Sequence, residues 1–419
     1  MKQLPDRYVL RGAAVLDPAG EFADGVDLLV SDGRIAQVGR GIRAEGIDSL
    51  DAGGLWIMPG LVDCHAHLTM HSLEPYQSMQ RPITLWALQA ADTARQTLRS
   101  GVTFARDAGG SEAGLKAAIA GGLTAGPRLQ IAILMLSSTG AHADGFLAGP
   151  GLEASAWYDT PDYPGRPNPL VDGAPEMRRR VRELVRAGAD WIKLCATGGL
   201  ASEYDEPDAP DFAADEIAEA VAEGARRGRP VMVHCYGGTA LDHSLRAGAR
   251  SVEHGALLTE QQCAEMASRG CWLVPTRSAL LDDVEQARSG RFSPVINEKT
   301  LRIEPALDDY VLMAREAGVR IATGTDGIEA RRQARIVDEL RALRQAGLTA
   351  AEVLAAATSE AAALCGVADQ VGSIAPGFAA DLIITESEPG ADGNYAELDP
   401  PPGVIQAGRA VALPAQLSE

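Results

Sequence analysis

Gly60-Leu-Val-Asp-Cys-His-Ala-His67 is an apolar run that ends in two histidines separated by one residue. Alternate side chains share one face of a β-strand, so His65 and His67 point the same way and can hold one metal ion. Later apolar runs end in further ligand-capable groups, which are Lys193, His234, His254 and Asp326. A single His-x-His pair is weak evidence for a metal site. Ligand-capable groups at the ends of successive parallel strands, by contrast, predict a metal-dependent hydrolase.

The composition fits a globular protein with a catalytic barrel and a smaller module. The chain has 419 residues, of which 46% are hydrophobic and 23% charged, and a barrel of this kind needs about 250. The formal net charge of −19 argues against nucleic acid or an anionic membrane surface as a partner, because both repel an acidic protein. We therefore expect a small-molecule substrate, with no nucleic-acid or membrane partner.

The ends and the cysteines of the chain indicate a cytoplasmic protein. The N-terminal Met-Lys-Gln-Leu-Pro-Asp-Arg lacks the apolar stretch of a secretory signal. The longest apolar region, residues 117–136, is interrupted by Pro127 and Arg128 and does not fit a membrane span. The six cysteines show no Cys-x-x-Cys pairing, which favours reduced thiols in the core.

Short strand-like segments lie near both ends of the chain. They are residues 8–12, 26–30, 34–38, 55–57, 380–385 and 403–411. Asp32-Gly33 predicts a tight hairpin turn between two of them. Neither end has enough strands for a stable sheet alone. We therefore expect residues 1–58 and 370–419 to pair into one small β-sandwich module.

Residues 59–369 alternate apolar strands with helical segments, which predicts an α/β fold with a (β/α)₈ TIM barrel. The expected strands are 61–67, 101–107, 128–135, 190–195, 230–234, 251–254, 272–276 and 320–326. The expected helices include 85–100, 174–187, 215–227 and 305–317. A long connection, 137–173, carries Trp157, Tyr158 and Tyr163, and connections of this length usually carry function or cover a site.

Lys193 distinguishes between kinds of metal site. A lysine inside an apolar strand is costly to bury as an ammonium, and an ammonium cannot bind a cation. Burial and adjacent ions would lower its pKa, and the neutral amine can then react with CO₂. The resulting carbamate has two oxygens that can bridge two ions. The alternative is a buried lysine paired with a carboxylate.

These residues resemble the amidohydrolase superfamily, in the branch whose dinuclear site is bridged by a carboxylated lysine. The resemblance covers nearly the whole chain, including Met58–Asp63 and Gly372–Leu382 at the ends of the barrel. Ile192-Lys-Leu-Cys-Ala-Thr-Gly-Gly199 and the segment Ala247–Gly255 are similar to prolidase-like metallo-carboxypeptidases and imidazolonepropionase-related amidohydrolases. The resemblance thus agrees with the fold that the strand pattern predicts.

The resemblance implies two divalent ions, with zinc expected. It implies one ion held by His65, His67, Lys193 and Asp326, and the other held by Lys193, His234 and His254. It also implies that His142 and Tyr236 contact the substrate carbonyl or carboxylate. Arg277, Arg331 and Arg332 are further candidates for a substrate carboxylate, since guanidinium groups pair with carboxylates through two hydrogen bonds.

We expect hydrolysis of an amide bond in a dipeptide or an N-acyl amino acid. A hydroxide bridging the two ions would attack the carbonyl, and Asp326 would move its proton to the leaving nitrogen. One alternative is the same chemistry on an aryl amide, carbamate or phenylurea. Others are a mononuclear deaminase or cyclic-amide hydrolase, and a non-catalytic barrel. A homo-oligomer is expected, as for many enzymes of this size.

Overall fold

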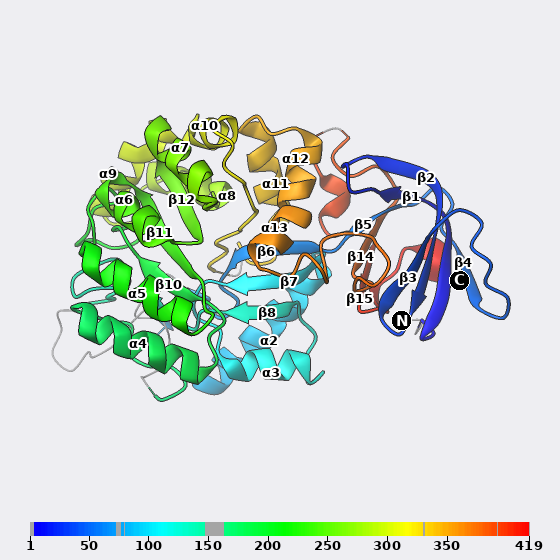
Figure 1. Ribbon diagram of the computed structural model, residues 1–419, viewed down its shortest axis with the longest axis horizontal. Helices are drawn as coiled ribbons and strands as arrows, with labels where there is room; N and C mark the ends of the chain where they lie inside the picture. The colour runs from blue at the N-terminus through cyan, green and yellow to red at the C-terminus, as the bar shows by residue number, and fades with distance from the viewer. Residues whose placement is uncertain are drawn as a thin grey trace. The chain divides into compact units, whose positions relative to one another are not determined.

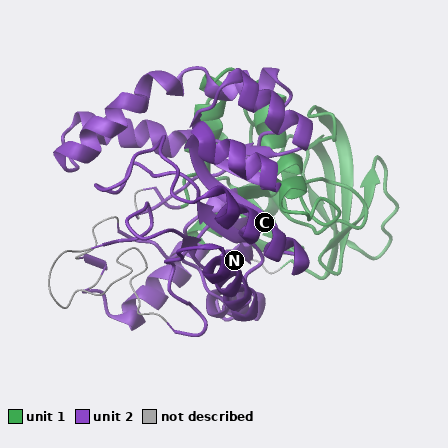
Figure 2. Ribbon diagram, turned by 60° about the vertical axis from the view of Figure 1, so that its left-hand side comes forward, with its two compact units in different colours: residues 1–63, 95–104, 334–419 green, residues 64–94, 105–333 purple. Residues whose placement is uncertain are grey.

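The computed structural model describes residues 4–72, 77–78, 80–146, 163–329, 332–391 and 393–418. The chain divides into two compact units (Figure 2). One comprises residues 1–63, 95–104 and 334–419, and the other comprises residues 64–94 and 105–333. The domain boundaries expected near residues 58 and 370 stay a prediction.

Both ends of the chain contribute to one eight-stranded sheet in the first unit, as predicted. Its order is β16-β15-β14-β5-β1-β2-β3, with β4 paired to β1. The ends meet where β14 runs antiparallel to β5, with Ile383 opposite Met58. The strands are β1 (Arg7–Leu16), β2 (Phe22–Ser31), β3 (Arg34–Gly39), β4 (Asp48–Asp51), β5 (Trp56–Pro59), β14 (Leu382–Thr385), β15 (Gly403–Gln406) and β16 (Arg409–Ala412).

The predicted turn at Asp32-Gly33 joins β2 and β3. Asp32 has φ 52° and Gly33 has φ 76°, which is the left-handed backbone that a two-residue hairpin of this type requires. A Cβ atom at Gly33 would lie 2.9 Å from the Ala407 carbonyl oxygen. Glycine is therefore required at this position by both conformation and space.

The core of this sheet is made of alternating apolar side chains from all its central strands. Leu10, Leu28, Ile57, Leu382 and Ile405 are each 0% exposed. The helices of the same unit after residue 334 are α11 (Ile336–Gln345), α12 (Ala350–Ala356), α13 (Ser359–Leu364), η3 (Ala396–Leu398) and α14 (Ala415–Ser418).

The barrel strands follow the predicted order and run parallel in two sheets, β6-β7-β8 and β9-β10-β11-β12-β13. Their bounds are β6 (Leu61–Ala66), β7 (Val102–Asp107), β8 (Arg128–Ile131), β9 (Met135–Leu136), β10 (Ile192–Cys195), β11 (Val231–Gly237), β12 (Ser251–Leu257) and β13 (Trp272–Val274). The third predicted strand is interrupted between β8 and β9, because Ile133 has φ 70°. Asp190 N donates to Ile131 O at 2.8 Å across this break.

The eighth predicted strand, 320–326, closes the ring. Ile321 forms a parallel bridge with Leu273 of β13. On its other side, Cys64 N donates to Thr323 O at 2.9 Å, and Asp326 N donates to His65 O at 2.8 Å. These backbone hydrogen bonds link the last strand to β6, so the (β/α)₈ prediction is confirmed.

Helices connect the strands at the predicted places, although 305–317 divides into η2 and α10. α5 packs against β10 and β11, and α6 packs against β11 (Figure 1). Within the described ranges, no helix is long and apolar enough to cross a membrane. The helices are α2 (Ile83–Arg99), α3 (Ala113–Ala120), α4 (Ala174–Ala187), α5 (Ala214–Arg226), α6 (Gly238–Ala247), α7 (Glu260–Arg269), α8 (Arg277–Arg288), α9 (Pro294–Ile303), η2 (Glu304–Leu307) and α10 (Tyr310–Glu316).

Much of the long connection expected to cover the site lies outside the described residues. This applies to 147–162, and therefore to Trp157 and Tyr158. Tyr163 is described and is 42% exposed, with backbone hydrogen bonds to Arg166 in both directions. The covering role of this segment stays a prediction.

The terminal sheet generates a stability prediction. Ile384→Ala should lower the free energy of unfolding by about 2–5 kcal/mol, because Ile384 is 0% exposed and lies in β14 between β5 and β15. Urea denaturation followed by circular dichroism measures the change. Val38→Ala is the control. Val38 is 36% exposed, so this substitution should lower the free energy of unfolding by less than about 1 kcal/mol. Equal losses for the two variants would contradict a central position for β14.

Candidate metal centre

The six predicted ligands come together around one cavity of about 440 Å³. His65 lies on β6, Lys193 on β10, His234 on β11 and His254 on β12. His67 follows β6, and Asp326 ends the segment that closes the ring. All six side chains line this cavity, so the sequence prediction that they share one site agrees with the geometry.

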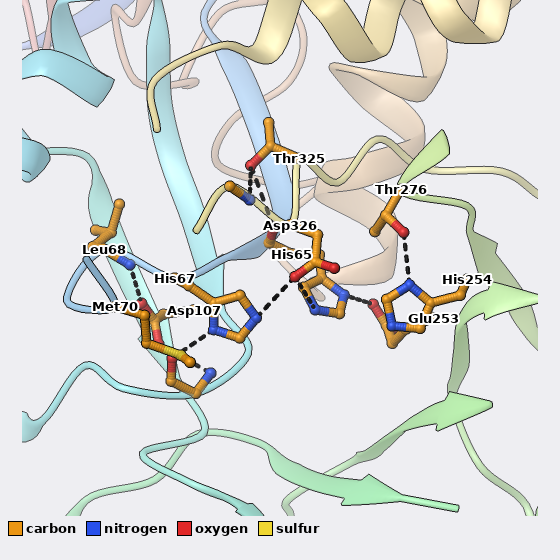
Figure 3. Close-up of polar contacts among 12 residues, drawn as sticks. His65, His67, Leu68, Met70, Asp107, Glu253, His254, Thr276, Thr325 and Asp326 are labelled. Carbon is orange, nitrogen blue, oxygen red and sulfur yellow. Dashed lines mark hydrogen bonds and ion pairs between the residues drawn. The ribbon is translucent and has the colours of Figure 1, made fainter. Parts of the chain in front are cut away.

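The carboxylate of Asp326 is the meeting point of the first group. Its Oδ1 lies 3.1 Å from His67 Nε2 and 3.5 Å from His65 Nε2 (Figure 3). Potential ligand atoms of His65, His254 and Asp326 all lie within 4.8 Å of one another. Two imidazoles and a carboxylate at this spacing are a donor set that suits a divalent ion such as Zn²⁺.

His234 and His254 form the second group, with ring centroids 4.5 Å apart. His234 Nε2 lies 3.1 Å from the Gly198 carbonyl oxygen. Because a carbonyl only accepts hydrogen bonds, Nε2 carries the proton and Nδ1 keeps its lone pair. His254 Nδ1 contacts Thr276 Oγ1 at 2.7 Å (Figure 3). Both rings are thus held through one nitrogen, as metal-ligating histidines usually are.

Lys193 is fully buried, at 0% exposed. Its Nζ makes no hydrogen bond with any residue that the structure describes, so the alternative of a lysine hydrogen-bonded to a carboxylate finds no support there. Burial lowers the pKa of this amine below its usual value. A buried polar atom without a partner is costly, so this amine is an unfavourable feature of the site as it stands.

Asp326, His65 and His254 have the charge states that metal binding requires. Burial alone would raise the pKa of Asp326, but the neighbouring imidazoles of His65 and His67 outweigh it and hold this pKa well below its usual range. Burial lowers the pKa of His65 to about 4, and it lowers the pKa of His254 far below normal. An ionised carboxylate and neutral imidazoles are the ligand forms that bind metal.

The backbone is strained where the strands end at the cavity. His254, Thr276 and Asp326 have φ values of 74°, 45° and 47°, which is the left-handed region that non-glycine residues rarely adopt. Such strain is common at functional sites, where it aims side chains away from the regular strand alternation.

Three buried charges beside the histidines were not anticipated from the sequence. Glu253 Oε2 accepts a hydrogen bond from His65 Nδ1 at 2.8 Å, and Arg106 pairs with Glu253. Asp107 accepts from Gly109 N at 3.1 Å and from Leu68 N at 2.9 Å. The available signals were a glutamate directly before His254 and an Arg-Asp pair at the end of an apolar strand.

The Asp107 contacts organise the loop that holds His67. The Gly109 carbonyl oxygen lies 2.7 Å from His67 Nδ1, so Nδ1 donates and Nε2 faces Asp326. Burial would lower the pKa of His67, but the hydrogen bond to Asp326 outweighs it and raises this pKa. The loop after β7 therefore fixes the direction of the His67 ring, with Nε2 toward Asp326.

His142 and Tyr236, the predicted substrate contacts, both line the cavity. The His142 ring stacks on His234 with centroids 4.3 Å apart, and its Nδ1 lies 3.5 Å from Asp205 Oδ2. Asp205 is held in turn by Lys299 Nζ at 2.7 Å. Tyr236 stacks on His254 with centroids 5.4 Å apart. Both side chains are next to the candidate ligands, within reach of a bound substrate.

Arg277 is not brought to the cavity. It is 6% exposed, its guanidinium donates to the Leu307 carbonyl, and it lies 6.0 Å from the Tyr310 ring centroid. The left-handed turn at Thr276 starts α8 directly after β13, and Arg277 is the first residue of that helix. Among the other predicted arginines, Arg332 lines the cavity and pairs with Asp282 and Asp283. Arg331 lies outside the described residues.

Comparisons with known proteins agree with this site and fold. The chain matches the amidohydrolase family over residues 56–411. It is 32% identical to ochratoxinase of Aspergillus niger over 345 residues, which is 80% of this chain and 70% of that protein. A crystal structure of an amidohydrolase has a TM-score of 0.89 at 32% identity, covering 98% of this chain and all (100%) of the other.

A crystal structure of a prolidase complexed with N-methylphosphonate-L-proline is also similar. Its TM-score is 0.88 at 29% identity, and the match covers 97% of this chain and 100% of the prolidase. Family match, fold and clustered ligands agree with one another. The chain therefore belongs to the amidohydrolase family, whose members typically bind divalent metals, and it is a hydrolase of carbon–nitrogen bonds.

Proposed function

We propose that the protein hydrolyses the amide bond of a dipeptide or an N-acyl amino acid at a centre of two divalent ions, with zinc expected. The observation that carries the proposal is Lys193, whose buried amine makes no hydrogen bond with the described residues and lines the same cavity as the candidate ligands. A mononuclear deaminase or cyclic-amide hydrolase has no use for an amine at this place. A carbamate formed from Lys193 and CO₂ would give the two ions a shared ligand.

The proposed ligands divide into two groups that share Lys193. His65, His67 and Asp326 would hold one ion, and His234 and His254 the other. When bound, the ions would polarise the amide carbonyl and supply a nucleophile at neutral pH. The two groups agree with the observed contacts of Asp326 with His65 and His67 and with the packed rings of His234 and His254.

Asp326 is the proposed proton carrier. Its pKa is held well below the usual range, so its carboxylate is ionised and able to accept a proton at Oδ. An amide nitrogen leaves as an amine once it is protonated, so Asp326 would return that proton to the leaving group. The side chain is 21% exposed and lines the cavity, where a substrate would meet it.

His142 and Tyr236 are proposed to hold the substrate carbonyl or carboxylate through N–H and O–H donors. The ring of His142 is fixed from behind by Asp205 and Lys299. Tyr236 is 3% exposed, and its backbone N donates to Thr197 Oγ1 at 3.2 Å. Donors whose positions are fixed before binding orient a substrate at low entropic cost.

Two relatives support the proposed substrate class. A prolidase with a bound phosphonate derivative of proline is structurally similar, and ochratoxinase is similar in sequence. A second candidate is the same chemistry on an aryl amide, carbamate or phenylurea. It is favoured by Phe146 and Tyr204, which line the cavity with ring centroids 6.0 Å apart and could pack on an aromatic group.

We further propose a cytoplasmic homo-oligomer without nucleic-acid or membrane partners. All six cysteines are buried free thiols, which supports a reducing compartment. The net charge of −19 disfavours binding to other polyanions. Light scattering of the purified protein measures the oligomeric state.

A substrate panel tests the proposed function. The zinc-loaded protein should hydrolyse dipeptides or N-acyl amino acids with kcat/KM at least about tenfold above matched anilides and phenylureas, a difference of about 1.4 kcal/mol in transition-state binding. Amine release at neutral pH is the measurement. Faster turnover of the anilides and phenylureas would instead favour the second candidate.

Asp326→Asn tests the proton path. The variant should retain at least one metal ion per chain and lose about 10²–10⁴-fold in kcat, the usual contribution of general acid–base catalysis. Metal analysis and kinetics on the same sample separate the two effects. Asp338→Asn is the control, because Asp338 forms an exposed pair with Arg335. A near-wild-type rate for Asp326→Asn would refute the proton path.

Lys193→Met tests the buried amine. It should raise the stability of the metal-free protein by about 1–3 kcal/mol, since it removes an unpartnered buried polar group, and it should reduce bound metal to one ion or fewer per chain. Thermal denaturation and metal analysis are the measurements. Lys299→Met is the matched control. Lys299 is 2% exposed and paired with Asp205, so this substitution should lower the stability of the protein. Full metal content in Lys193→Met would overturn the bridging role.

The stabilising effect of Lys193→Met should depend on pH. Burial lowers the pKa of Lys193 in the folded state below the ordinary value of 10.5, so between these two values the unfolded chain binds the extra proton. Wild-type stability therefore rises with pH across that window. The difference between variant and wild type should be largest below the lowered pKa and should shrink as the pH approaches 10.5. A difference that grows with pH would contradict this account.

A further inference from the structure

A buried ion pair lies beneath the candidate metal centre. Arg106 Nη2 donates to both carboxylate oxygens of Glu253, each at 3.0 Å. The guanidinium also donates to Ser251 Oγ at 3.0 Å and to the Cys64 carbonyl oxygen at 2.5 Å. Arg106 and Glu253 are each 0% exposed. This pair therefore links β7, β12 and β6 inside the barrel.

The pair touches His65 from two sides. Glu253 Oε2 lies 2.8 Å from His65 Nδ1 (Figure 3), and the carbonyl that Arg106 holds belongs to Cys64, the residue before His65. A carboxylate paired with a guanidinium only accepts hydrogen bonds, so His65 Nδ1 must carry the proton. The lone pair of His65 then lies on Nε2, the atom 3.5 Å from Asp326 Oδ1.

The charges of Arg106 and Glu253 cancel without a metal ion. A buried carboxylate that lost its guanidinium partner would be strongly unfavourable, because only the neutral donors Ser251 Oγ and His65 Nδ1 would stay hydrogen-bonded to it. The guanidinium is itself fixed, since it stacks 4.6 Å above the Trp191 ring, and Trp191 Nε1 donates to Gln130 Oε1 at 2.7 Å. The support for His65 is thus complete before any ion arrives.

We propose that the Arg106–Glu253 pair is a positioning element that presets the tautomer and direction of His65 for metal binding. The inference rests on the proposed metal centre and is independent of the proposed substrate. Its function is to keep the affinity for metal high by sparing His65 any rearrangement on binding. Partners of this kind typically change metal affinity by about 10–100-fold.

Zinc affinity of the full-length, metal-free protein tests the proposal, measured by competition with a chromophoric chelator. Glu253→Gln and Arg106→Met should each weaken zinc binding by about 10–100-fold. Arg106→Lys should recover part of the loss, because it restores the charge without the planar contacts. Glu253→Gln is nearly isosteric, so it keeps the test decisive if Arg106→Met fails to fold.

Arg166→Met is a matched control for simple loss of a buried arginine. Arg166 is 2% exposed, pairs with Glu112 at 3.0 Å and stacks 5.6 Å from the Trp86 ring centroid. The Arg166→Met variant should have a lower midpoint of thermal denaturation and a zinc affinity within about twofold of wild type. The double variant Arg106→Met/Glu253→Gln should regain stability relative to Arg106→Met, since no charge stays unpaired, without regaining affinity.

Two results would overturn the proposal: unchanged zinc affinity in Glu253→Gln, or an equal loss of affinity in Arg166→Met. A wild type that binds zinc tightly yet hydrolyses no dipeptide or N-acyl amino acid would refute the proposed substrate class alone. A wild type that binds no zinc would refute the metal centre and this proposal together.

Discussion

The site depends on the hydrogen bonds that join the two ends of the strand ring. Asp326 N donates to His65 O, and Cys64 N donates to Thr323 O, so the eighth strand segment is tied directly to the first. The same residue, Asp326, then places its carboxylate against His65 and His67. Without ring closure, the acid and the two histidines would be far apart in a chain of 419 residues, and the cavity would lose the residue that joins its ligands.

The fold, and the gathering of the six candidate ligands around one cavity, could be predicted from the sequence because both follow from local patterns. Apolar runs ending in His, Lys or Asp mark strand ends, and parallel strands place those ends together. Asp32-Gly33 fixed its hairpin through backbone conformation alone. The contact of Arg106 with Glu253 could not be predicted, since the two residues are 147 positions apart in the sequence. The alternation of side chains along a strand predicts which face a residue lies on, but not which distant residue it contacts. Arg277 does not line the cavity, because α8 begins at this residue, directly after the left-handed Thr276.

The centre combines features that cost stability with one that restores it. Lys193 Nζ is buried without a hydrogen bond from the described residues, and three strand-end residues have left-handed backbones. Each of these is unfavourable by an amount of order 1–3 kcal/mol. Beneath them, Arg106, Glu253 and Ser251 are hydrogen-bonded to one another. These paired side chains stabilise the structure around the strained strand-end residues and Lys193.

The pairing of β14 with β5 has a consequence for synthesis on the ribosome. The edge of β5 is made early, but its partner begins only at residue 382. During most of translation, the N-terminal strands therefore present an open edge, which is a template for pairing with other chains. Nascent protein should thus be most prone to aggregate, and most dependent on chaperones, until Leu382–Thr385 emerge from the ribosome.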